Sequence, residues 1–223
     1  MKNKILLRSA FVALFAAIIS LTSFFRIPLG PVPIVFQNVM CIFSGIVFGG
    51  LYAGAPTALF LAAGLIGLPV YSGGSGGIGI WAGPTGGFLL GYLLAAILAG
   101  LIAGKPDISE KKPSKTKIVR ICLAFLCGTV IIYIPGLLWF AHWALANSKV
   151  QEGKSLLSYT LSACMLPFIP GDLIKIAIFI PISLKIRPIL AQYLQNNKQT
   201  GLKNNAEASS AASEEKNPEN PAD

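Results

Sequence analysis

Long apolar runs alternate with short polar or glycine- and proline-containing segments along most of the chain. Residues 27–104 contain no Lys, Arg, Asp, Glu or His. At ~20 residues for each crossing, this stretch alone holds enough apolar sequence for about three membrane spans. The predicted spans cover residues 9–25, 34–49, 51–67, 88–103, 118–143 and 161–184. The pattern therefore predicts an all-α integral membrane protein, a bundle of six transmembrane helices.

The composition agrees with a membrane protein. Hydrophobic residues make up 54% of the 223 residues and charged residues only 12%, whereas roughly a quarter of the residues of a soluble domain are charged. Much of the surface is therefore expected to face lipid. The four cysteines all fall in apolar runs, which indicates buried or lipid-facing thiols rather than a disulfide framework. The charged start and first apolar run resemble a signal peptide, but we expect this run to remain as a span because the next run is itself membrane-spanning.

The net charge of +9 comes mainly from three basic segments: before the first span, between the fourth and fifth, and after the sixth. Their residues are Lys2, Lys4, Arg8, Lys105, Lys111, Lys112, Lys115, Lys117, Lys185 and Arg187. Six spans place these segments on one side of the membrane, and the positive-inside rule makes that side cytoplasmic. We expect both termini to be cytoplasmic. Residues 1–195 form the predicted transmembrane domain, and the polar residues 196–223 form a predicted disordered cytoplasmic tail.

The segment 68–87 is uncharged and rich in glycine, and its predicted position is on the outer side. Irregular backbone near a membrane must be buried in protein or line a wet cavity, because lipid cannot satisfy its N–H and C=O groups. Residues 74–79 spell G-x-G-x-x-G. A dinucleotide site requires a strand before this motif and a helix after it, and the pattern predicts neither. We therefore do not expect a dinucleotide cofactor.

Other candidate chemistry is weak. Residues 153–155 resemble the end of a phosphate-binding loop, but Ser148 stands where its opening glycine belongs. If transport is driven by ATP, we expect the ATPase to be another chain. His142 is the only histidine and lies among aromatic residues typical of a membrane interface, so no metal site is expected. We find no nucleophile–base arrangement, and we expect a protein that is not an enzyme and needs no cofactor.

Asp172 and Lys175 stand out as charges inside the sixth predicted span. Residues three apart share a helix face, and each charge at mid-membrane costs about 2.5–3.5 kcal/mol on insertion scales. That cost indicates a position in the protein interior or in a cavity. Two interpretations remain open: a structural ion pair that satisfies itself, or a pair that receives a polar ligand.

Small residues recur at four-residue spacing, and such stripes allow helix backbones to approach closely. On the first span they are Ser9, Ala13 and Ala17. Packing inside the bundle is one interpretation, and contact with a partner protein is the other because a first helix can lie at the edge of a bundle.

Four motifs, in this order, resemble those of the BioY family, the biotin-specific substrate-binding (S) components of energy-coupling factor (ECF) transporters. They are GPVPI at 30–34 followed by Gln37, GLPVY at 67–71 leading into the glycines of 73–77, GPTGG at 83–87, and Pro170-Gly171-Asp172 with Lys175. The resemblance implies a six-helix S component in the plasma membrane that captures biotin from the outer side. It implies docking on a membrane-embedded T component driven by two ABC-type ATPases, with Ser9, Ala13 and Ala17 in contact with the T component.

For the binding site we expect biotin to contact Asp172, Lys175, Gln37, Gly73, Gly76, Gly77, Tyr71, Trp81 and Thr85. Asp172 can accept from the ureido N–H groups, and Lys175 can donate to the ureido carbonyl or to the carboxylate tail. The glycine-rich segment can cover the pocket, and two aromatic rings can pack on the ligand. Phe88 stands where many relatives are expected to have Tyr. The alternatives are an S component for another vitamin and an autonomous secondary transporter of a small polar solute.

Overall fold

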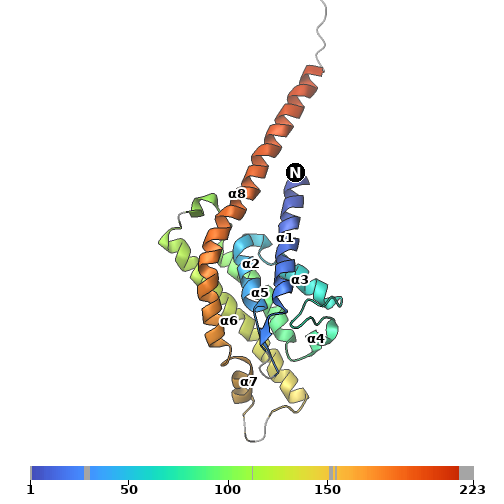
Figure 1. The fold of residues 1–223 in the computed structure, drawn as a ribbon, viewed down its shortest axis with the longest axis vertical. Helices are drawn as coiled ribbons and strands as arrows, with labels where there is room; N and C mark the ends of the chain where they lie inside the picture. Colours follow the sequence, from blue (N-terminus) through green and yellow to red (C-terminus); the bar gives the residue numbers. More distant parts are fainter. Residues whose placement is uncertain (1, 28–30, 112, 151–152, 154, 216–223) are drawn as a thin grey trace, which may run out of the picture.

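The computed structural model describes residues 2–27, 31–111, 113–150, 153 and 155–215. Several positions named above lie outside the described residues: Gly30, Lys112, Lys154 and residues 216–223 of the tail. The described chain is mostly helical (Figure 1). Its helices are α1 (Lys2–Thr22), α2 (Gln37–Phe48), α3 (Ala55–Leu65), α4 (Ile78–Ala82), α5 (Gly86–Ala103), α6 (Lys115–Ala146), α7 (Leu156–Cys164) and α8 (Ile169–Glu215), with short 3-10 turns η1 (Gly50–Tyr52) and η2 (Ile108–Lys111).

A two-stranded antiparallel ribbon follows α1. Strand β1 (Arg26–Ile27) pairs with β2 (Ile34–Val35), and Arg26 lies opposite Val35. Prolines at 31 and 33 cannot donate to a sheet and favour this short extended segment over a helix. The ribbon leads directly into α2.

Every predicted span contains a helix, but the helices differ in length. α1, α5 and α6 are long and apolar enough to cross a membrane, and α7 with the first part of α8 forms a fourth candidate bent by 40° at its break. α2 and α3 have only 12 and 11 residues, which at 1.5 Å per residue is about 18 Å or less. Three to four helices are therefore membrane-capable by length, and the count of six spans stays a prediction.

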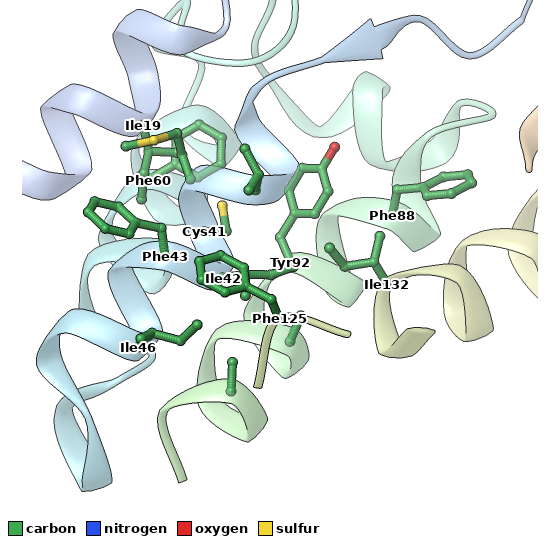
Figure 2. Close-up of a cluster of buried hydrophobic side chains, with 14 of the residues drawn as sticks. Ile19, Cys41, Ile42, Phe43, Ile46, Phe60, Phe88, Tyr92, Phe125 and Ile132 are labelled. Atoms are coloured by element: carbon green, nitrogen blue, oxygen red, sulfur yellow. The ribbon is translucent and has the colours of Figure 1, made fainter. Parts of the chain in front are cut away.

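α2 lies at the centre of the bundle, and 11 of its 12 residues are buried. Figure 2 shows apolar side chains of α2 meeting side chains of α1, α3, α5 and α6. Gly45 allows this approach, because a Cβ there would collide with the backbone of Ala96 in α5. A short central helix of this kind is surrounded by protein on most sides.

The ends of α2 and α5 are held by a buried arginine from α8. Arg187 is fully buried, and its guanidinium donates to both carboxylate oxygens of Glu110 in η2, to Ile46 O in α2, and to the carbonyls of Ala103, Gly104 and Lys105. The sequence pattern treats Arg187 as an inner-side charge beyond the sixth span. In the structure α8 continues without a break, and this arginine satisfies the last carbonyls of two helices.

The C-terminal segment differs from its prediction. Composition predicts disorder from residue 196, whereas α8 extends to Glu215. Ala, Glu, Lys, Gln and Leu in this segment are good helix formers. The division of the chain into a membrane domain and a tail stays a prediction.

Candidate functional site

A cavity of roughly 270 Å³ opens between the β-ribbon, the glycine-rich segment and helices α2, α5, α6 and α8. Its wall is mostly apolar with a few polar groups, which is typical of a small-molecule site. The lining residues are Arg26, Pro31, Val32, Pro33, Val35, Gln37, Asn38, Tyr71, Ser72, Ser75, Ile80, Pro84, Thr85, Phe88, Leu89, Tyr92, Ile132, Tyr133, Cys164, Phe168 and Lys175.

Asp172 and Lys175 form an ion pair at one side of this cavity, with 2.6 Å between Asp172 Oδ1 and Lys175 Nζ. Both residues are only 5% exposed. Asp172 lies in the first turn of α8, where a negative charge interacts favourably with the helix dipole. The two charges cancel, so the pair is an allowed buried unit.

Asn38 joins the two members of the pair. Its Nδ2 donates to Asp172 Oδ1 at 2.8 Å, and its Oδ1 accepts from Lys175 Nζ at 3.0 Å. Lys175 Nζ also donates to Val35 O at 3.0 Å, and Tyr133 Oη donates to Asp172 Oδ2 at 2.6 Å. An ammonium has three N–H donors, and Asp172, Asn38 and Val35 receive all three.

Four of the residues predicted from the sequence line the cavity: Gln37, Tyr71, Thr85 and Lys175. Asp172 is not on the wall itself but is bonded to Asn38 and Tyr133, which are. Gln37 Nε2 donates to Val70 O at 3.0 Å, which ties the start of α2 to the glycine-rich segment.

Trp81 and the three glycines are not among the described residues that line the cavity. Trp81 Nε1 donates to Tyr71 Oη at 2.9 Å, and Tyr71 Oη donates to Leu61 O. The N–H groups of Gly73 and Gly77 donate to Ser23 O and Gly64 O, and Gly76 packs on the carbonyl of Leu68. These residues shape the segment, and the direct contact of Trp81, Gly73, Gly76 and Gly77 with a ligand stays a prediction.

Sequence reasoning missed Asn38 and Tyr133. Asn38 follows Gln37 directly, and two neighbouring amides at the start of an apolar run are a usable signal. Tyr133 sits in the fifth apolar run among residues of similar hydropathy, and nothing in its local sequence separates it from a core aromatic residue.

The small residues of the first helix are on its outer side. Ser9, Ala13 and Ala17 are exposed, whereas Phe15, Ala16 and Ile19 pack into the bundle. Among the described parts of the chain nothing covers this stripe, so packing within the bundle does not account for it.

Comparison with known proteins gives a consistent result. The model of the BioY family matches residues 1–192. A biotin transporter BioY from Rhodobacter capsulatus is 38% identical over 170 residues, which are 75% of this chain and 86% of that protein. One from Lactococcus lactis is 32% identical over 188 residues, 83% of this chain and 92% of that protein. A crystal structure of the S component for biotin from an ECF-type ABC transporter matches with a TM-score of 0.69 and 30% identity, covering 84% of this chain and 94% of that one.

Proposed function

This chain belongs to the BioY family and transports biotin, and from this premise we propose that biotin binds in the cavity beside Asp172 and Lys175. The observation that carries the proposal is the buried network of Asp172, Lys175, Asn38 and Tyr133 at the cavity wall. Such a network is costly to bury and is expected where a polar ligand has to be recognised.

The chemistry of biotin suits this wall. Its ureido group has two N–H donors and one carbonyl acceptor. Asp172 is the acceptor that the N–H groups need, and a hydrogen bond to a charged carboxylate is stronger than one to a neutral group. Lys175 neutralises Asp172, and it can donate to the ureido carbonyl by exchanging one of its three present hydrogen bonds. Gln37 provides an amide beside them.

The fused ring and aliphatic chain of biotin need apolar surface. Phe88, Leu89, Ile132 and Phe168 provide it on the wall, together with the ring of Tyr71, which Phe60 supports edge-on at 5.5 Å between ring centroids. Thr85 lies at the start of α5 on the same wall. Phe88 contributes an apolar ring to the wall and has no hydroxyl group such as a tyrosine would provide there.

In the membrane, we propose six spans with both termini cytoplasmic, the glycine-rich segment outside, and the plasma membrane as the location. Figure 1 supports a common side for the termini, since α1 begins and α8 ends toward the same end of the molecule, away from α4. The short helices α2 and α3 occupy the second and third spans of this arrangement. The polar residues 196–223 follow the last span on the cytoplasmic side.

As partners we propose a membrane-embedded T component and two ABC-type ATPases that drive uptake. The exposed stripe of Ser9, Ala13 and Ala17 on α1 supports a helix-to-helix contact, because small residues let another helix approach closely.

The direct test is equilibrium binding of biotin to the purified protein and to Asp172→Asn and Lys175→Ala. We expect each variant to lose at least tenfold in affinity, since each leaves the other charge buried without its partner. Wild-type affinity for biotin in both variants would contradict the proposed binding site. A panel of other vitamins tests the alternative substrate, and uptake that survives ATP depletion would favour an autonomous secondary transporter.

A further inference from the structure

Two cations line the cavity, and they differ in what surrounds them. Lys175 is bonded to Asp172, Asn38 and Val35 and has no N–H group left over. The side chain of Arg26, which is exposed, forms no hydrogen bond or ion pair with any described residue, although it lines the same cavity. Since Asp172 cancels Lys175, the cavity wall carries one net positive charge, on the guanidinium of Arg26.

The backbone of Arg26 is fixed to the wall. It pairs with Val35 across the β-ribbon, and the carbonyl of Val35 accepts from Lys175. The ribbon therefore connects Arg26 to the ion pair of α8 through one residue.

The guanidinium lies against the glycine-rich segment. A Cβ at Gly73 would collide with Arg26 Cζ and its neighbouring nitrogens, so the guanidinium lies directly over the Cα of Gly73. Gly73 has φ +72°, a value that glycine adopts without strain, and its N–H donates to Ser23 O at 2.9 Å. Both the shape and the backbone of this turn thus favour glycine beside Arg26.

A second unused group lies next to Gly73. Ser72 lines the cavity, and its hydroxyl oxygen is a buried polar atom without a hydrogen-bond partner among the described residues. Buried hydroxyls of this kind are uncommon because an unmade hydrogen bond is costly. Ser72 is therefore available to donate to an acceptor inside the cavity.

We propose that Arg26, together with Ser72, binds the carboxylate of biotin and makes the site selective for the anionic ligand. This inference rests on the proposed function, because it needs biotin in the cavity. The ureido end then lies at the Asp172 side and the carboxylate at the side of the β-ribbon. A guanidinium can hold both carboxylate oxygens in a fork of two N–H groups, and Lys175 keeps its place against Asp172.

The test compares biotin with its neutral methyl ester at pH 7 on four purified proteins: wild type, Arg26→Gln, Arg26→Lys and Ser72→Ala. We expect the wild type to bind biotin roughly 10- to 100-fold more tightly than the ester, as for a charge-assisted hydrogen bond. Arg26→Gln should remove this preference while leaving the affinity for the ester within about twofold. Arg26→Lys should restore part of the preference, and Ser72→Ala should reduce it by a smaller factor.

Arg120→Gln is the matched control. Arg120 donates to Ile102 O at the other end of α5 and does not line the cavity, so its variant should keep the full preference. The proposal is overturned if Arg26→Gln still prefers biotin as wild type does, or if Arg26→Gln weakens both ligands equally. A wild-type protein that binds neither ligand would instead refute the proposed function.

Discussion

Arg187 and Glu110 form a buried, two-pronged ion pair, with Arg187 Nε 2.7 Å from Glu110 Oε2 and Arg187 Nη2 3.1 Å from Glu110 Oε1. The pair joins α8 to the segment between α5 and α6, and Lys117 adds a second cation to the same carboxylate. Arg187 also satisfies carbonyls at the ends of α2 and α5. One side chain therefore holds four elements together, and it lies on α8 12 residues beyond Lys175.

Arg187→Ala should destabilise the protein by about 3–5 kcal/mol, because the buried carboxylate of Glu110 would keep Lys117 as its one cationic partner among the described residues. Thermal unfolding in detergent measures this loss. Lys185→Ala is the control, since Lys185 is an exposed lysine two residues away on α8 and should unfold as wild type does. Biotin affinity of the folded Arg187→Ala protein should be unchanged, and a selective loss of affinity without loss of stability would contradict this structural role.

Low pH should weaken the ion pair between Glu110 and Arg187. Burial raises the pKa of Glu110, but hydrogen bonds and charges from Arg187 and Lys117 outweigh this and hold the pKa below its ordinary value. A carboxyl group with a lowered folded pKa stabilises the protein fully above its unfolded pKa of about 4.3 and loses that contribution as the pH falls through the folded value. Unfolding temperature should therefore fall on acidification below about pH 5.

Glu110→Gln isolates this effect, because glutamine does not titrate. It should be less stable than wild type at pH 7, and the difference should shrink as the pH is lowered. Asp107→Asn is the control: the backbone and side chain of Ser109 lower the pKa of Asp107, but this carboxylate is exposed and should contribute little. An equal pH dependence in wild type and Glu110→Gln would show that other groups cause the acid sensitivity.

Asn38→Ala should reduce biotin affinity by roughly 10- to 100-fold, since Lys175 loses an acceptor and Asp172 loses a donor at the same time. Isothermal titration of the purified protein measures the change. Asn147→Ala makes the same substitution at an exposed asparagine at the end of α6 and should bind as wild type does. Wild-type affinity in Asn38→Ala would mean that the ion pair orients itself without the amide.

Ala13→Leu and Ala17→Leu should abolish uptake into cells while leaving biotin binding to the purified protein intact, because the added bulk lies on the exposed face of α1. Val130→Phe, which enlarges a residue that is 60% exposed on α6, is the control and should transport normally. Uptake at the wild-type rate in both α1 variants would argue against a partner on this face.

The sequence pattern predicts some parts of this site better than others, for physical reasons. Asp172 and Lys175 are recognisable because a charge in an apolar run needs an explanation. Tyr133 and Ser72 give no such signal, because a phenol or a hydroxyl is common in apolar helices and loops. The sequence pattern does not single out Arg26, since its place over Gly73 depends on how the β-ribbon folds back.

Some helices of the fold are likewise predicted better from the sequence than others. Apolar runs predict the helices α5 and α6 closely because these helices coincide with single runs. The lengths of α2 and α3 depend on the proline and glycine segments beside them and on burial by other helices, which hydropathy does not report. Arg187 shows the reverse error: a charge at the end of an apolar run is fully buried, because three segments distant in sequence bring their carbonyls and a carboxylate to it.

The hydrogen bonds of two indole rings also give this transporter a natural optical probe. Trp81 Nε1 is bonded to Tyr71, whose ring lines the cavity, and Trp139 Nε1 donates at 2.8 Å to the carbonyl of Gly83, next to Pro84 on the wall. The third tryptophan, Trp143, packs beside Phe140 and is not among the described residues that line the cavity. Biotin does not absorb in the near ultraviolet, so a change in tryptophan fluorescence when it enters the cavity would come from the protein. Biotin capture can therefore be followed in real time without attaching a dye.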